Sequence, residues 1–263
     1  MRDYHIHTKR CGHARGEIEQ YVERALEAGL EEIGFSDHLP FVHKRDPGYT
    51  MALDELPGYV EDVEKMRALY PRVRIKLGVE ADYFPDQEKQ TEKLLKAHPF
   101  DFVLGSVHFI DGWGFDMPEE EENWRGKDVD QIYHDYFGLL RQAAQTGFFD
   151  IIGHTDLVKK FGHRPTRRLT EEVEKTATAF KEADLAVEIN TSGLRRPVRE
   201  IYPAMEILKV YHRYGIPIVF GSDAHAPEEV GEDFDKAATH AKEAGYSKAL
   251  IFEKRRVLGH YAF

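Results

Sequence analysis

The sequence predicts an α/β protein that folds as a parallel (β/α) barrel, and two observations support this. Short apolar runs of strand length alternate with helical segments along the chain, and seven or eight such repeats fill its 263 residues. Polar side chains that can bind metals directly follow most of these runs. A doubly wound open sheet is the structural alternative, which the absence of a glycine-rich fingerprint after the first run disfavours. The length suits one large domain or two small ones.

The first half of the chain is expected to contain four strands and three helices. Gly29 and Pro71 end two of the helices, because glycine favours the helix C-cap and proline interrupts a helix. The helix before Pro71 carries apolar residues at helical spacing from Leu56 to Tyr70. The expected strands cover residues 3–6, 32–35, 73–79 and 100–104, and the helices cover residues 18–28, 54–70 and 87–97.

The second half is expected to contain three or four strands and four helices. Thr170 is the expected N-cap of one helix, and Gly215 is the expected C-cap of another. The strands are expected at 148–152, 185–189 and 217–220, with an eighth or edge strand at 248–252, and the helices at 129–144, 170–183, 202–214 and 234–244. Residues 111–127 include four consecutive glutamates and are too long for an ordinary βα loop, so we expect a lid or a flexible acidic insertion.

Charge and composition narrow the function classes. Acidic residues outnumber Lys and Arg by 47 to 36, which gives a formal net charge of −11. Proteins that bind nucleic acid or anionic membranes normally carry a basic excess, so neither partner is expected. Cys11 is the single cysteine, so no internal disulfide can form, and the MRDYHIHT start lacks the apolar stretch of a signal peptide. We therefore expect a cytoplasmic protein, and the sequence does not indicate its oligomeric state.

Histidines are concentrated where the expected strands end. His5 and His7, like Asp223 and His225, are spaced i, i+2, which places both side chains of a pair on one face of an extended segment. The carboxyl ends of barrel strands meet at one mouth, where active sites are built. Imidazole and carboxylate groups together bind zinc, manganese or iron, so the sequence predicts a metal site at this mouth. The strand-end residues are His5, His7, His13, Asp37, His38, Glu80, Asp82, His108, His154, Asp156, Asn190, Asp223 and His225.

The other histidines are expected to have structural or surface roles. They are His43, His98, His134, His163, His212, His240 and His260. Cys11 is expected to be a small buried or loop residue rather than a nucleophile, because no catalytic motif frames it.

Six motifs, in chain order, resemble those of the PHP (polymerase and histidinol phosphatase) superfamily. They are H-I-H-T…C-G-H-A, F-S-D-H, G-V-E-A-D, G-S-V-H, G-H-T-D and G-S-D-A-H. Four pieces resemble its monofunctional histidinol-phosphate phosphatase branch. They are T-K-R-C-G-H-A, S-V-H-F with the G-W-G-F-D segment, K-K-F-G-H and N-T-S-G-L-R-R-P. The resemblance covers nearly the whole chain. It implies a TIM-like, distorted (β/α)7 barrel that forms a single domain over residues 1–263, with the acidic insertion at about 111–127.

The resemblance also implies a site for three divalent transition-metal ions, which could be Zn, Mn or Fe. One ion is expected on His5, His7, Glu80 and Asp223. A second is expected on Glu80, which bridges, with His108 and His154. A third is expected on His13, His38 and His225, where many superfamily members have an aspartate at the position of His13.

The activity implied is hydrolysis of L-histidinol phosphate to L-histidinol and phosphate, a step of histidine biosynthesis. Two ions that share Glu80 are expected to generate a bridging hydroxide, which attacks phosphorus in line. Glu80, Asp223 and His225 are the expected catalytic residues, and the general acid for the leaving group stays open. Arg195, Arg196 and Lys160 are candidates for phosphate contacts, because guanidinium and ammonium groups match phosphate oxygens.

Three other functions stay open. A PHP phosphoesterase could act on nucleotides or oligonucleotide ends, and a non-catalytic PHP module could stabilise a partner, although such modules often lose ligands that this chain keeps. A mononuclear amidohydrolase would also use the H-x-H pair on its first strand. It would normally require a lysine or an equivalent bridging ligand after a middle strand, whereas Glu80 takes the bridging role in this chain.

Overall fold

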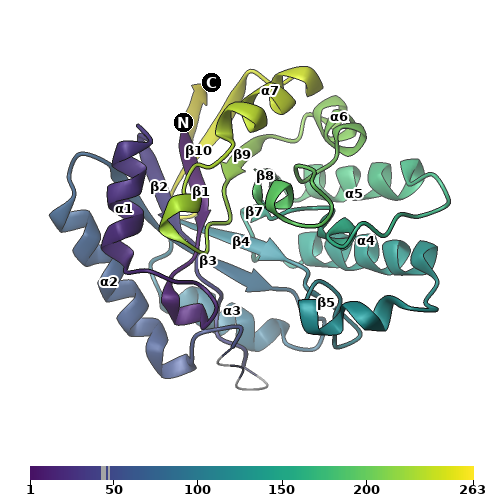
Figure 1. The fold of residues 1–263 in the computed structure, drawn as a ribbon, viewed down its shortest axis with the longest axis horizontal. Helices are drawn as coiled ribbons and strands as arrows, with labels where there is room; N and C mark the ends of the chain where they lie inside the picture. Colours follow the sequence, from purple (N-terminus) through teal and green to yellow (C-terminus); the bar gives the residue numbers. More distant parts are fainter. Residues whose placement is uncertain (43–45, 47) are drawn as a thin grey trace.

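The computed structural model describes residues 1–42, 46 and 48–263, and its centre is a sheet of parallel strands ringed by helices (Figure 1). The strand order is β1-β2-β3-β4-β7-β8-β9. The strands are β1 (Arg2–Ile6), β2 (Glu32–Phe35), β3 (Arg74–Asp82), β4 (Phe102–Ser106), β7 (Ile151–Ile152), β8 (Ala186–Asn190) and β9 (Ile218–Gly221). The α-helices are α1 (Ile18–Glu27), α2 (Leu56–Leu69), α3 (Glu88–Ala97), α4 (Val129–Gln145), α5 (Thr170–Glu182), α6 (Met205–Tyr214) and α7 (Phe234–Ala244). The 3₁₀ helices are η1 (Lys9–Cys11), η2 (Leu53–Glu55), η3 (Pro118–Trp124), η4 (Leu157–Lys159), η5 (Ser192–Arg195) and η6 (Pro227–Glu229).

The first and last strands of this sheet meet, so the seven strands form a nearly closed barrel. Ile6, the last residue of β1, forms a parallel bridge with Ala224, which follows β9. The His7 N–H donates to the Ala224 carbonyl at 2.9 Å, and the Ala224 N–H donates to the His5 carbonyl at 3.2 Å. The Asp3 carboxylate accepts a further bond from the Ser222 N–H at 2.9 Å. The predicted seven-stranded barrel is confirmed, and its closure lies at the carboxyl ends of the strands.

A plug of aromatic side chains fills the other end of the barrel. The ring of Phe102 on β4 lies over Gly34 and Gly78, and a Cβ atom on Gly78 would overlap this ring. The ring of Tyr4 packs edge-on against Phe102, with 4.9 Å between the ring centroids. Close packing leaves no room for side chains at the two glycines, so the barrel is filled rather than open from end to end.

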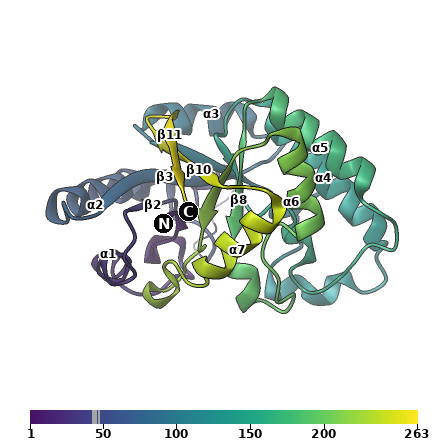
Figure 2. The same cartoon turned by 90° about the horizontal axis from the view of Figure 1, so that it is seen from above.

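A C-terminal hairpin covers this plugged end. β10 (Lys248–Glu253) pairs with β11 (Arg256–Ala262) in an antiparallel sheet of its own. The strand expected at 248–252 is therefore present, but it is not an eighth strand of the barrel. The Phe252 N–H donates to the Tyr4 hydroxyl at 3.0 Å, and the Lys254 N–H donates to the Asp101 carboxylate at 3.2 Å. β11 ends beside β1, with Arg2 stacked over Tyr261, and Figure 2 shows both chain termini together there.

Residues 111–127 form a packed segment. After the short strands β5 (Phe109–Ile110) and β6 (Trp113–Gly114), η3 carries the four glutamates. Trp124 is buried, its indole N–H donates to the Phe115 carbonyl at 2.9 Å, and its ring stacks on His163. The segment is therefore folded, and the buried indole packs it against the rest of the chain.

Several element boundaries differ from the expectation. Thr170 is the first residue of α5 rather than its N-cap, a position that Leu169 occupies. α6 begins at Met205 rather than at residue 202, and β3 continues through Glu80 and Asp82. His43 lies outside the described residues. Within the described residues, no helix combines the length and apolar character needed to cross a bilayer.

Candidate active site

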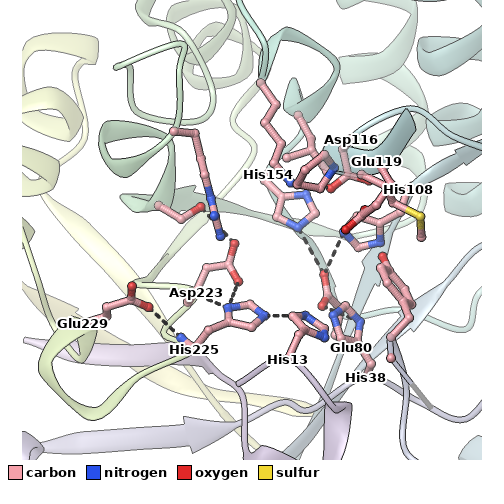
Figure 3. A pocket seen from close by; sticks show the side chains of 18 of the residues that line it. His13, His38, Glu80, His108, Asp116, Glu119, His154, Asp223, His225 and Glu229 are labelled. Carbon is pink, nitrogen blue, oxygen red and sulfur yellow. Dashed lines mark hydrogen bonds and ion pairs between the residues drawn. The ribbon is translucent and has the colours of Figure 1, made fainter. Parts of the chain in front are cut away.

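The carboxyl ends of the strands surround a cavity of about 640 Å³, which falls within the range of small-molecule sites (Figure 3). Its floor is formed by strand-end histidines and carboxylates, among them Glu80, His154 and Asp223. Asp116 and Glu119 of the acidic segment line one side of the cavity, and Glu229 lines another. The mouth predicted from the sequence is therefore a cavity large enough for a small molecule.

Glu80 occupies the centre of this floor, and its two carboxylate oxygens face different histidines. Ser106 Oγ donates to Oε1 at 2.6 Å. Oε1 also lies 3.1 Å from His154 Nε2 and 3.7 Å from His108 Nε2. Oε2 lies 3.1 Å from His38 Nδ1, 3.4 Å from His5 Nε2 and 3.5 Å from His7 Nε2. A carboxylate placed in this way can share its charge between two groups of imidazoles.

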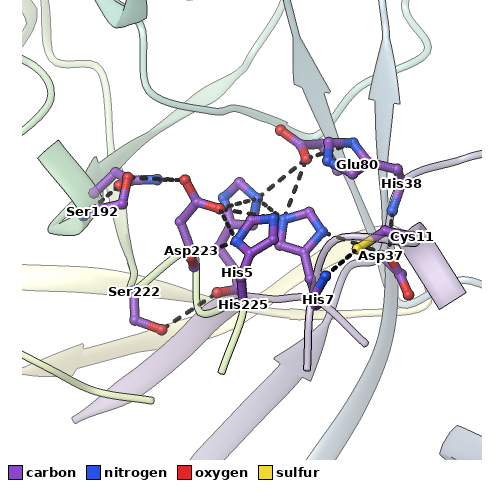
Figure 4. Close-up of polar contacts among 12 residues, drawn as sticks. His5, His7, Cys11, Asp37, His38, Glu80, Ser192, Ser222, Asp223 and His225 are labelled. Carbon is purple, nitrogen blue, oxygen red and sulfur yellow. Dashed lines mark hydrogen bonds and ion pairs between the residues drawn. The ribbon is translucent and has the colours of Figure 1, made fainter. Parts of the chain in front are cut away.

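Asp223 closes the floor opposite Glu80 (Figure 4). Its Oδ1 lies 3.3 Å from His7 Nε2 and 3.7 Å from His5 Nε2, and these two ring nitrogens are 3.0 Å apart. Its Oδ2 accepts a hydrogen bond from Ser192 Oγ at 2.9 Å. The backbone at Asp223 has φ 53°, a left-handed conformation that turns this side chain back toward β1.

The tautomers of four histidines follow from their partners. Nδ1 of His13 lies 3.1 Å from the Cys11 carbonyl, and Nδ1 of His225 lies 3.0 Å from the Asp223 carbonyl. Carbonyl oxygens only accept hydrogen bonds, so in the neutral rings Nδ1 carries the proton and Nε2 carries a lone pair. Those two Nε2 atoms face each other at 3.0 Å. His5 and His108 present Nε2 in the same way, because their Nδ1 atoms face carboxylates at 2.7 Å.

These converging lone pairs fit a cation better than they fit each other. Two unprotonated ring nitrogens at 3.0 Å repel unless a positive charge lies between or beside them. Imidazole nitrogen with carboxylate oxygen is the donor set of divalent transition metals. Two groups of described residues combine these ligands, with donor atoms within 4.8 Å of one another: His5, His7 and Asp223, and His5, Glu80 and His154. A third group of the same size consists of the imidazoles of His7, His38 and His225.

The electrostatic field of the site also favours positive charge. Burial alone would lower the pKa of His5, but the carboxylates of Glu188, Glu80 and Asp223 raise that pKa well above its ordinary value. Burial is likewise outweighed at His108, where Asp82 and Glu80 raise the pKa to about 9. The surrounding imidazoles hold the pKa values of Glu80 and Asp223 well below the ordinary range despite burial. Imidazoles and carboxylates thus favour each other's charged forms at these four residues, whereas burial and neighbouring imidazoles hold the pKa values of His38 and His225 well below the ordinary value.

All nine expected metal ligands lie in this cluster, with one difference in their grouping. His13 groups with His225 and Cys11, whereas His38 groups with His225 and His7. The reason is that His38 directs Nδ1 toward Glu80 Oε2 on the floor, while His13 is exposed at the rim.

The three expected phosphate contacts separate into two kinds. Lys160 and Arg196 line the cavity, and Lys160 Nζ lies 2.8 Å from the Asp116 carboxylate. Arg195 is not among the lining residues. Its guanidinium donates to the Ser222 carbonyl at 2.7 Å and pairs with Glu232 at 3.2 Å, so it supports the loop after β9 instead of facing the cavity.

The sequence reasoning missed several residues that hold this site. Glu188, in the middle of β8, accepts hydrogen bonds from His5 and from the backbone of His154. A single glutamate inside the apolar run L-A-V-E-I-N is a signal that could have identified it. Ser192 holds Asp223, and Tyr49 packs against the rings of His13 and His38. Arg15 also lines the cavity.

Comparison with known proteins gives two family matches that cover most of the chain. The PHP domain family matches residues 3–192, and the PHP-associated family matches residues 205–244. A probable histidinol-phosphatase from Deinococcus radiodurans is 39% identical over 256 residues, which cover 97% of each chain. A histidinol-phosphatase from Bacillus subtilis is 28% identical and covers 89% of this chain and 97% of its own length.

A solved structure has a similar fold along its entire length. The histidinol phosphate phosphatase from Lactococcus lactis, crystallised with zinc, L-histidinol and phosphate, superimposes with a TM-score of 0.85. The two chains are 25% identical, and the match covers 98% of each.

Proposed function

The chain belongs to the PHP domain family, and we propose that it is a metal-dependent phosphomonoesterase that hydrolyses L-histidinol phosphate to L-histidinol and phosphate. The observation that carries this proposal is the position of Glu80, whose two oxygens face separate histidine groups at the floor of a small-molecule cavity. The names of the Deinococcus and Bacillus relatives, and the ligands of the Lactococcus structure, support the substrate.

Divalent transition-metal ions would be held by the nine clustered side chains. His5, His7 and Asp223 would bind one ion together with Glu80, which would also serve a second ion on His108 and His154. His13, His38 and His225 would bind a third, between the exposed ring of His13 and the floor. Such ions, when bound, lower the pKa of a coordinated water and polarise phosphoryl oxygens, and zinc, manganese and iron all accept these ligands.

The chain's own groups would orient the substrate. Lys160 and Arg196 would donate charge-assisted hydrogen bonds to phosphate oxygens, which places phosphorus over the floor. Asp82 would keep the proton of His108 on Nδ1, and Ser192 would hold the Asp223 carboxylate in place. Glu119, which lines the cavity, would attract the cationic amine of the substrate.

The domain organisation, the cellular location and the partners are part of the same proposal. Residues 1–263 would form one domain, because β9, inside the segment matched by the second family, belongs to the same sheet as β1–β8. The cytoplasmic location and the absence of nucleic-acid and membrane partners stay predictions that rest on the single cysteine and the net charge of −11.

A turnover assay with metal analysis on the same sample tests the proposal. Histidinol phosphate and AMP are compared side by side at equal concentrations. We expect phosphate release from histidinol phosphate to be at least about 100-fold faster by kcat/KM, a difference of about 3 kcal/mol in transition-state binding. Equal or faster turnover of AMP would favour a nucleotide phosphoesterase. A protein that folds but retains no metal and no turnover would favour the non-catalytic module.

A further inference from the structure

Glu188 is a buried carboxylate that the expected mechanism does not use. It lies in the middle of β8, is fully buried, and belongs to none of the proposed ligand sets. Within the part of the chain that the structure describes, His5 is the only basic side chain that pairs with it, and no Lys or Arg does so. A buried carboxylate without such a partner is costly unless its neighbours satisfy it. The hydrogen-bond partners of the Glu188 carboxylate therefore indicate its role in the site.

Both oxygens of Glu188 accept hydrogen bonds from the metal-site residues around them. Oε1 lies 2.7 Å from Nδ1 of His5. Oε2 accepts from the backbone N–H of His154 at 2.8 Å and from Asn190 Nδ2 at 3.0 Å. A single side chain thus contacts His5 on one side of Glu80 and His154 on the other.

The sequence leaves room for this side chain at two glycines. A Cβ atom on Gly221 would overlap Glu188 Oε1 and come within 2.7 Å of the Cβ of His5. A Cβ atom on Gly153 would lie 3.5 Å from Glu188 Oε2 and 2.8 Å from Ser106 Oγ. Glycine is therefore required at position 221, the first residue of the G-S-D-A-H motif, because any larger residue would displace the Glu188 carboxylate.

We propose that Glu188 is a positioning residue that sets the Nδ1–H tautomer of His5 and the backbone of His154, and so couples the two metal positions that share Glu80. The inference rests on the proposed metal-dependent function. His5 can offer a lone pair at Nε2 only while its proton stays on Nδ1. The bond from Oε2 fixes the backbone of His154, which has a φ of 22°.

Glu188→Gln is a sharp test because it preserves volume but replaces one acceptor by a donor. If the amide NH₂ faces His5, the ring must move its proton to Nε2 and loses the lone pair that points at the floor. If the NH₂ faces His154 instead, it meets the backbone N–H of His154, so two hydrogen-bond donors face each other in a buried site. Either arrangement weakens the metal positions, whereas the native carboxylate satisfies both neighbours.

The measurement is zinc affinity by chelator competition, made on the full chain without reference to turnover. We expect Glu188→Gln to bind at least one zinc ion about 10- to 100-fold more weakly, the usual effect of losing a partner of a metal ligand. Glu32→Gln is the matched control, because Glu32 is an equally buried strand carboxylate that bonds to Tyr4 and Arg74 instead. It should keep the wild-type affinity.

A second measurement needs no variant. The ¹⁵N spectrum of the zinc-loaded wild-type protein should show His5 protonated at Nδ1, and protonation at Nε2 would overturn the proposal even if Glu188→Gln fails to fold. Wild-type affinity in a folded Glu188→Gln would also overturn it. If the wild-type protein binds no zinc, manganese or iron, the proposed function itself is wrong, and this result is distinguishable from the previous two.

Discussion

Arg195 and Arg196 are adjacent in the sequence, yet they should respond to alanine substitution in opposite ways. Arg196 lines the cavity, and Arg196→Ala would remove a charge-assisted hydrogen bond to phosphate. Such a bond contributes about 1.5–3 kcal/mol, which corresponds to a loss of roughly 10- to 150-fold in kcat/KM. The melting temperature should change little, because the side chain is partly exposed.

Arg195→Ala should mainly destabilise the fold. Its guanidinium supplies a hydrogen bond to the carbonyl of Ser222, a fully buried residue next to Asp223. A buried acceptor left unpaired costs about 1–3 kcal/mol, which lowers the melting temperature of a chain of this size by roughly 2–12 °C. Loss of kcat/KM should be smaller than for Arg196→Ala when both proteins are assayed well below their melting temperatures.

The assay combines steady-state hydrolysis of histidinol phosphate with thermal unfolding at one fixed zinc concentration, since bound metal stabilises the folded state. Arg195→Lys and Arg196→Lys serve as controls that keep the positive charge. The reasoning is refuted if Arg195→Ala loses more kcat/KM than Arg196→Ala while its melting temperature is unchanged. That pattern would place the Arg195 guanidinium on the substrate.

Three further predictions follow from the site and the barrel. Glu80→Gln should reduce turnover below detection and lower the zinc content measured by elemental analysis. The reason is that the histidines on both sides of Glu80 lose the negative charge of its carboxylate. A variant that keeps its full metal content and its activity would contradict this. Treatment with a chelator should abolish activity and lower the melting temperature, and added zinc or manganese should restore both; full activity in the chelator would argue against metal dependence. Phe102→Ala should cost about 3–5 kcal/mol in urea unfolding of the metal-free protein, and Gly78→Ala about 1–3 kcal/mol. The double variant should cost less than the sum, because the added methyl occupies space that the ring vacates, and additive costs would show that the two sites do not touch.

The strand-end histidines were predictable because their positions depend on a general property of barrels. Side chains that follow parallel strands converge at one end, whatever the distance between them in the sequence. His5 and His225 are separated by about 220 residues, yet both contribute to one floor. The sequence could not show how the nine residues divide into groups, because that depends on ring orientations such as that of His38 toward Glu80.

The different roles of the two arginines were not predictable from the pattern. Their separation follows from contacts with residues about 27 positions away, at the loop after β9. The C-terminal hairpin was missed for a local reason. Its turn residues, Lys254 and Arg255, have φ values of 49° and 62°, where tight hairpins normally use Asn or Gly. Asp101 holds this turn by accepting hydrogen bonds from both backbone N–H groups. This is a long-range interaction, which no local sequence pattern predicts.

The aromatic plug and the hairpin that covers it close one end of the barrel, so within the described residues the cavity lies at the opposite end, where the strands have their carboxyl ends. We expect substrate and both products to pass through that end. If phosphorus is held over the floor, as proposed, the alcohol lies on the solvent side and is expected to leave before phosphate. Phosphate is then the product expected to compete with incoming substrate for the enzyme, which product-inhibition kinetics would test.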